Sequence, residues 1–420
     1  MGKMLSPKMY SADREILRRL AARVREIAEL PIMDERRRLW RKHASLEGER
    51  PMILAETQGV VDEILPDRAL HCREPWARDL ERRLRLLIFQ HEHVEDDFVI
   101  EPWIACNWQV DLGNYGVTIE KVRGDNEGKL GSYVWEPPIK DLDRDFAKLK
   151  PRTFSVDREA TLAWKAHLEA LFEGILPVRI RGSFYWTMGL TWPCIDLIGL
   201  EGLMLAMYDN PRGLHRLMAF LRDDHLALVD WLTQEQLYSL NNENDYVGSG
   251  TVGYTDELPQ PGWSPGDPVR PKDLWVLSES QETVGVSPAM FEEFIFPYQL
   301  PIIERFGLCY YGCCEPLHSR WPILKRIPNL RRVSVSPWCD QEYMAEALGT
   351  DYIFCRKPSP ALVSDALWDE EAIREDLRHT VAVADGCHLE IVMKDVHTLA
   401  DEPDRLGRWV RIARQETKRM

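Results

Sequence analysis

The feature that most constrains the fold is an alternation of short apolar runs with helical patterns, which becomes regular after Thr153. Short apolar runs bounded by turn residues are typical of buried strands, and apolar residues at three- and four-residue spacing are typical of helices. The eight predicted strands are Arg50–Glu56, Val178–Gly182, Leu237–Leu240, Leu274–Leu277, Leu308–Tyr311, Arg331–Val335, Tyr352–Cys355 and His388–Met393. Strands that alternate with helices indicate an α/β fold with a parallel sheet, and eight such units predict a closed (β/α)8 TIM barrel.

The domain organisation follows from the same pattern. Residues 1–50 are expected to form an N-terminal helical extension, because Ser11–Leu30 carries apolar residues at helical spacing. The barrel is expected over residues 51–420, with an insertion at about 65–151 that covers one end of it. A doubly wound open sheet is the alternative, although no Gly-rich phosphate loop follows the first strand. Further helices are predicted at Trp76–His91, Leu214–Leu232, Pro288–Phe306, Gln341–Leu348 and Glu370–Ala384.

Composition excludes several classes of partner. The 420 residues carry a formal net charge of -15, and the acidic residues are spread along the chain. A nucleic-acid-binding protein needs a clustered basic face, and a membrane span needs a long apolar run; the sequence has neither. Nine cysteines are too sparse and too odd in number for a disulfide framework. No signal peptide is recognised at the N-terminus, so a cytoplasmic protein is expected.

Reactive side chains follow nearly every predicted strand, which is where a barrel enzyme places its active site. Carboxylates there can act as acids or ligands, and tryptophans can form an apolar wall for a small-molecule substrate. The alternative for the glutamates is a salt bridge to Arg181, Lys357 or Lys394. The candidate catalytic residues are Glu243, Glu279, Glu315, Lys394 and Asp395, and the candidate substrate-binding residues are Arg181, Trp186, Asn242, Gln281, Trp338 and Arg356.

Two adjacent thiols, Cys313 and Cys314, lie where the Leu308–Tyr311 strand gives way to a loop, and His397 follows the last strand. Thiolates and imidazoles are zinc ligands, so Cys314, His397 and Cys313 are the candidate metal ligands. Cysteines also serve simply to fill buried space, and alternation along a strand turns only one of two neighbours inward. The acidic segment around His91–Asp97 is expected to be a solvated turn.

The order Leu274–Glu279, Val286–Tyr298 and Gly312–Glu315 resembles the uroporphyrinogen decarboxylase superfamily. Its most specific element is Ser-Pro-x-Met-Phe-x-x-Phe-x-x-Pro-Tyr, at residues 287–298, and the resemblance covers roughly residues 150–415. It implies a single TIM-like barrel. The chain has no Arg-Gln-Ala-Gly-Arg segment of the kind that holds the tetrapyrrole, which argues against heme-pathway decarboxylation.

The corrinoid-linked methyltransferases of this superfamily hold zinc with a His-x-Cys strand end and a later cysteine. Cys314 matches the family cysteine, Gly312 stands at the histidine position, and His397 falls close to the late position. The resemblance implies a substituted site made of Cys314 and His397 with Glu243 or Glu315.

The function so predicted is a zinc-dependent methyltransferase that acts on a small O- or N-methylated substrate. The corrinoid is expected on a separate protein, because the chain has no Asp-x-His-x-x-Gly motif. One alternative is a cofactor-independent decarboxylase or lyase acting on a carboxylated substrate. The other is a non-catalytic barrel that binds a small molecule. The sequence leaves a homodimer open.

Overall fold

The structure, a computed structural model, describes residues 8–123, 133–182 and 184–418. Six strands form one parallel sheet, in the order β1-β14-β13-β12-β11-β10. These strands are β1 (Met52–Ala55), β10 (Trp275–Ser278), β11 (Leu308–Tyr311), β12 (Leu330–Val335), β13 (Ile353–Arg356) and β14 (His388–Met393). The α/β prediction is confirmed, and so are seven of the eight predicted strands. Six of these seven form the sheet, and the other is β7 (Val178–Arg181).

Closure of the barrel was predicted, and over the described residues the backbone ladder is not closed. β7 pairs only with β2 (Ile104–Asn107), in a separate two-stranded sheet. The predicted strand Leu237–Leu240 is not a strand, because side chains take the place of the ladder beside it. The Asn241 side chain donates to the Trp275 carbonyl at 3.0 Å and accepts from the Trp275 amide at 2.9 Å. The strands therefore follow a barrel-like order with an interrupted hydrogen-bond ring.

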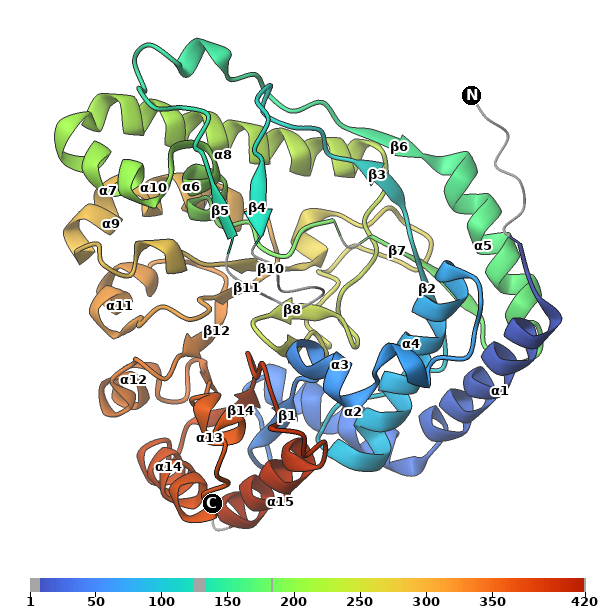
Figure 1. Cartoon of the computed structure of the whole chain (residues 1–420). Coiled ribbons are helices and arrows are strands. Elements are labelled where there is room, and N and C mark those ends of the chain that lie inside the picture. Colours follow the sequence, from blue (N-terminus) through green and yellow to red (C-terminus); the bar gives the residue numbers. More distant parts are fainter. Residues whose placement is uncertain (1–7, 124–132, 183, 419–420) are drawn as a thin grey trace.

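Helices lie between the strands as predicted, and Figure 1 shows α11, α12 and α14 on the outer side of β12 and β14. The predicted helix Pro288–Phe306 divides into two at Ile295, because Pro297 lacks an amide proton and its ring clashes with the preceding turn. The helices are α1 (Ser11–Ala28), α2 (Pro31–Ala44), α3 (Val61–Ile64), α4 (Pro75–Phe89), α5 (Arg158–Phe172), α6 (Thr191–Ile198), α7 (Leu200–Asp209), α8 (Pro211–Gln234), α9 (Pro288–Phe294), α10 (Phe296–Ile303), α11 (Trp321–Leu324), α12 (Gln341–Leu348), α13 (Ala361–Ser364), α14 (Glu370–Val383) and α15 (Arg405–Thr417). None of the described helices is both long and apolar enough to cross a bilayer.

Small antiparallel pairs complete the fold. They are β3 (Gln109–Asp111) with β6 (Ser155–Asp157), β4 (Lys121–Arg123) with β5 (Tyr133–Trp135), and β8 (Tyr246–Gly248) with β9 (Thr251–Val252). The β3–β6 pair joins the predicted insertion to the segment that follows it, and the β4–β5 pair lies within the insertion. The boundaries of the N-terminal extension and the insertion stay predictions.

Side chains alternate between the two faces of the six-stranded sheet. Ile53, Val276 and Ile391 pack outward with the helices, whereas Leu54 and Leu277 pack inward in a second apolar cluster. That second cluster also contains the buried face of α1, so the N-terminal helices share a core with the inner face of the strands.

The inner face also carries buried charge. Glu390 on β14 lies 3.5 Å from the His43 imidazole and 3.8 Å from the Arg332 guanidinium, and it accepts a hydrogen bond from the Thr251 hydroxyl at 3.2 Å. Burial disfavours the charged carboxylate, but Arg332 and His43 outweigh it and lower the pKa of Glu390 to about 2. The centre of the fold is therefore ionic as well as apolar.

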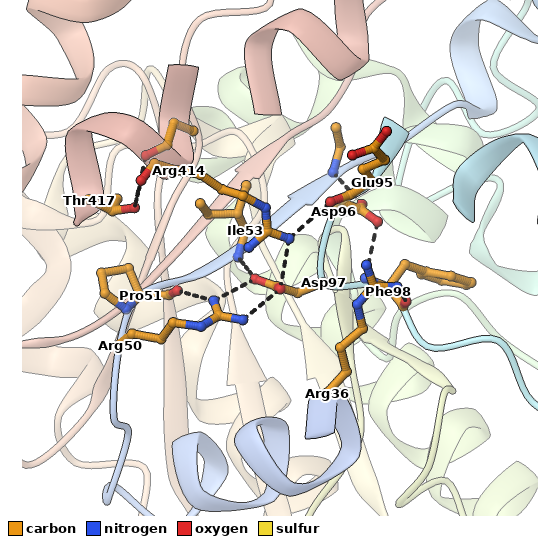
Figure 2. Close-up of polar contacts among 12 residues, drawn as sticks. Arg36, Arg50, Pro51, Ile53, Glu95, Asp96, Asp97, Phe98, Arg414 and Thr417 are labelled. Atoms are coloured by element: carbon orange, nitrogen blue, oxygen red, sulfur yellow. Dashed lines mark hydrogen bonds and ion pairs between the residues drawn. The ribbon is translucent and has the colours of Figure 1, made fainter. Parts of the chain in front are cut away.

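The free edge of β1 is covered by carboxylates, as Figure 2 shows for Asp97. Asp97 accepts hydrogen bonds from the Ile53 amide at 2.9 Å, from Arg50 at 2.8 Å and from Arg414 at 3.0 Å. Asp96 accepts from the Ala55 amide at 2.9 Å. Both aspartates are 1% exposed, so the expectation of a solvated turn was wrong for them. Buried edge amides need acceptors, and these side chains supply them.

Replacing Asp97 tests this edge. We expect Asp97→Ala to lower the free energy of unfolding by about 2–3 kcal/mol, because it leaves the Ile53 amide and two arginines without their acceptor. The expected loss of unfolding free energy is smaller than for a fully buried ion pair, because Arg50 and Arg414 are about one-third exposed and water can solvate them in the variant. Urea unfolding followed by circular dichroism measures the loss.

The matched control is Glu92→Ala, which removes a carboxylate from a surface pair with Arg23 and should cost less than about 1 kcal/mol. The contribution of Asp97 should also depend on pH, because the arginines hold its pKa below the ordinary value despite burial. It is fully present above about pH 4 and is lost as the pH falls through the folded-state pKa. Equal losses in the two variants would contradict the assignment.

Candidate functional site

Three side chains from separate parts of the chain meet at the carboxyl ends of β11 and β14. The Lys394 ammonium lies 2.6 Å from the Ser249 hydroxyl, and that hydroxyl lies 3.3 Å from the Cys313 sulfur. Lys394 itself is 3.9 Å from the Cys313 sulfur. We call Cys313, Cys314, Ser249, Lys394 and Asp395 the thiol–lysine cluster.

The local backbone explains how β11 delivers Cys313. Gly312, the residue after the strand, has a φ of 100°, a left-handed conformation that favours glycine. A Cβ atom there would also lie 2.7 Å from a Leu317 methyl group. The position matched to the histidine of the resembling methyltransferases therefore has both a conformation and a space that suit only glycine.

The two thiols have different surroundings. Their sulfurs are 3.5 Å apart; Cys313 is buried, whereas Cys314 is exposed and lies 3.7 Å from an Asp395 oxygen. The hydrogen bond from Cys314 lowers the pKa of Cys313, and Lys394 and Ser249 add to this against the opposing effect of burial. The same contact raises the pKa of Cys314, and partial desolvation of its sulfur by neighbouring groups adds to this. The contacts with Lys394 and Ser249 therefore favour ionisation at Cys313 over ionisation at Cys314.

Two predicted glutamates lie next to this cluster. Glu315 is buried and accepts hydrogen bonds from the Ser280 amide at 2.8 Å and the Cys313 amide at 2.9 Å, so it fixes the loops after β10 and β11. One oxygen of Glu279 accepts from the Gln281 amide at 2.9 Å, and the other has no hydrogen-bond partner among the described residues. Burial and the neighbouring Glu282 and Glu315 raise the pKa of Glu279 well above its usual range. Burial and these acidic neighbours therefore favour the protonated form of Glu279.

The other predicted residues are held elsewhere. Each polar one has a partner in the fold: Glu243 pairs with Arg179 at 3.1 Å, Arg181 with Asp245, Asn242 donates to the Leu258 carbonyl, and Arg356 pairs with Asp376 at 3.1 Å. Trp186 and Trp338 are 42% and 72% exposed and are not part of a buried wall. For the glutamate at position 243, the salt-bridge alternative is the one observed, with Arg179 as the partner.

The predicted zinc ligands are not assembled. His397 is exposed and lies near Gly59, where its Nδ1 is 3.7 Å from the position of an added Cβ. Over residues 8–123, 133–182 and 184–418, no group of three or more His, Cys, Asp or Glu side chains is arranged to hold a metal ion. The thiol pair is the part of the predicted set that comes together.

A cavity of about 420 Å³ lies at the carboxyl end of β1. The turn between β8 and β9 joins it to the thiol–lysine cluster, since Ser249 belongs to the cluster and Gly250 to the cavity wall. The wall is formed by Leu54, Ala55, Glu56, Thr57, Gln58, Val61, Leu86, Leu87, Gln90, Asp96, Phe98, Asn244, Tyr246, Gly250, Thr251 and Val252.

Sequence reasoning missed Ser249, which lies in this turn, and Tyr246, which begins β8. The signal that could have found them is Gly248-Ser249-Gly250. At Gly250 the φ is 86°, and an added Cβ would lie 2.6 Å from Val392 and 3.2 Å from a Glu56 oxygen. The glycines let the turn approach the ends of β1 and β14 closely.

No protein-family model matches the sequence, and no curated protein sequence matches it. Among solved structures, the chain is similar to a methyltransferase from Methanosarcina mazei, with a TM-score of 0.50 and 11% identity over 89% of this chain and 97% of that chain. At that identity the likeness shows the fold. The chain is therefore an α/β protein with the architecture of that methyltransferase.

Replacing the lysine tests the electrostatics of the cluster. We expect Lys394→Met to raise the apparent pKa of the Cys313–Cys314 pair, because the ammonium that stabilises the thiolate is lost. Iodoacetamide alkylation, followed by peptide mass spectrometry across a pH series, measures the shift. The rate at neutral pH should fall in the variant.

Cys387 is the internal control, since it is a half-buried thiol beside β14 at the opposite end from Lys394 and should react at the same rate in both proteins. An unchanged pH profile for the pair would show that Lys394 does not stabilise the thiolate.

Proposed function

We propose that this chain is an enzyme that transfers a methyl group from a small O- or N-methylated substrate at the thiol–lysine cluster. The observation that carries the proposal is the Cys313 thiol after β11, held 3.3 Å from Ser249 and 3.9 Å from Lys394, which follows β14. A thiolate stabilised by a neighbouring cation is a strong nucleophile towards carbon. The likeness in fold to a methyltransferase supports the methyl group as the group transferred.

Each residue of the site has its own role in the proposed reaction. The Cys313 sulfur attacks the methyl carbon and forms a carbon–sulfur bond, while the bond from that carbon to oxygen or nitrogen breaks and leaves its electron pair on the heteroatom. A leaving oxygen needs a proton, and Glu279 is the buried carboxylic acid available to supply it. Lys394 remains charged and stabilises the thiolate before the attack. Glu315 holds the Cys313 and Ser280 amides and acts as a positioning residue.

Zinc, and a corrinoid on a separate protein that would take the methyl group onward, stay predictions from the family resemblance. The ligand set expected for zinc does not fit the geometry of the described residues, because His397 and Glu243 have other surroundings. A homodimer also stays a prediction.

A second candidate function is the cofactor-independent decarboxylase or lyase. The observation that favours it is Glu279, whose protonated carboxyl has an unpartnered oxygen and could deliver a proton to carbon after a carboxylate is lost. A non-catalytic barrel remains the third candidate.

The methyl-transfer proposal is tested by incubating the protein with methyl-labelled aryl ethers and methylated amines and measuring intact mass. We expect one labelled methyl group on Cys313 and none in Cys313→Ser. The control variant Cys387→Ser should be labelled like the wild type, because that thiol lies outside the cluster. Labelling that persists in Cys313→Ser, or no labelling with any donor, would refute the proposal, and release of carbon dioxide from carboxylated compounds would favour the second candidate.

Elemental analysis tests the zinc prediction. We expect His397→Ala to leave the zinc content of the purified protein unchanged, because His397 is exposed beside Gly59. Any zinc held by the thiol pair should instead decrease in Cys314→Ala. Loss of about one zinc per chain in both variants would restore the predicted ligand set and show that His397 moves towards the thiols.

A further inference from the structure

We infer that the cavity beside β1 binds a methylated ammonium cation, which makes an N-methylated amine the substrate of the reaction. Methyl transfer at that site rests on the proposed function, whereas binding of the cation does not. The volume of about 420 Å³ suits a small organic molecule.

Most of the cavity wall is apolar. Leu54, Val61, Leu86, Phe98 and Val252 contribute side chains to it. Several of these side chains are only partly buried, as expected for a wall that faces an open space. A wall of this kind favours methyl groups over strongly hydrated groups, because methyl groups gain by leaving water.

The charge of the wall has one sign. Among the described lining residues, the charged side chains are the carboxylates Glu56 and Asp96, and no Lys, Arg or His lines the cavity. Lys394 and Lys357 are the cations that act on Glu56, and neither lines the cavity. Lys394 is already in contact with Ser249, Cys313 and Asp395, and Lys357 donates to the Tyr310 hydroxyl at 2.8 Å. A carboxylated ligand would therefore meet negative charge, whereas a cation would be attracted.

The two carboxylates differ in what they can still bind. Asp96 accepts from the Ala55 amide, the Gln90 side chain at 2.8 Å and the Phe98 amide at 3.1 Å, so its oxygens are committed to the fold. Glu56 interacts with the Tyr246 side chain and keeps acceptor capacity at the cavity wall. Glu56 is thus the group that would pair with a bound cation.

Aromatic rings strengthen this preference. Tyr246 and Phe98 both line the cavity, and a quaternary ammonium group binds to aromatic faces through their quadrupole. An apolar wall, one available carboxylate and two aromatic rings are together the chemistry that recognises a methylated ammonium group.

The same chemistry suits the transfer step. When the thiolate attacks a methyl group of a quaternary ammonium, the carbon–nitrogen bond breaks, its electron pair stays on nitrogen, and a neutral amine leaves. No proton is needed, which agrees with a wall that carries no cationic acid. The product loses its charge, so its attraction to Glu56 falls and its release is favoured.

Binding is tested by calorimetry at about pH 8, well above the ordinary glutamate pKa, because burial raises the pKa of Glu56. The probes are choline, its neutral isostere 3,3-dimethyl-1-butanol and the anion 3,3-dimethylbutanoate. We expect choline to bind at least about tenfold more tightly than the neutral isostere, and the anion to bind most weakly. This comparison uses the wild-type protein, so it does not depend on whether a variant folds.

The variant Glu56→Gln should lose the preference for choline, and Asp62→Asn should retain it, because Asp62 is an exposed carboxylate on α3 outside the cavity wall. Equal binding of the three probes, a preference for the anion, or no binding would each overturn the inference. Choline binding without methyl transfer to Cys313 would keep this site and refute the proposed function. Methyl transfer from ethers to Cys313 without a preference for choline would support the proposed function and overturn the cation site.

Discussion

The fold depends on side chains that satisfy the two edges of the six-stranded sheet. At β1, the Asp97 and Asp96 carboxylates accept from the Ile53 and Ala55 amides, and the Gln90 side chain donates to the Ala55 carbonyl at 3.0 Å. At β10, the Asn241 side chain makes both hydrogen bonds with Trp275. Buried strand edges need such partners, and here carboxylates and amides replace neighbouring strands.

The contacts at these two sheet edges fix the positions of the strand ends that carry the candidate site. The Asp96–Asp97 pair fixes β1 beside β14, so Glu56 at the end of β1 lies near Lys394 at the end of β14. On the other side, Glu315 joins the loops after β10 and β11 and sets the backbone of Cys313. The cluster is thus built from strand ends that ionic and hydrogen-bonding contacts hold in place, and the glycine turn at Gly250 brings Ser249 to it.

Much of the fold could be predicted because strands and helices arise from local patterns. β11, α12 and β14 match their predicted limits, and the helix after Val286 fails only at Pro297, where a local rule applies. A closed barrel was predicted because Leu237–Leu240 has the apolar pattern of a strand, although it does not form one. Its role depends on Asn241 meeting Trp275, a contact between distant positions that no local pattern encodes.

The sequence by itself determined which segments form strands and helices, and that reactive side chains follow the strands, because both depend on neighbours along the chain. Only the tertiary structure decided that Cys313 is buried beside Lys394 and Ser249 and that His397 is exposed near Gly59. It also decided that the charged residues of the cavity wall are carboxylates. Those features depend on how separate strand ends meet in space. Burial and charge at a site are sums over all of its neighbours, so they exist only once the chain has folded.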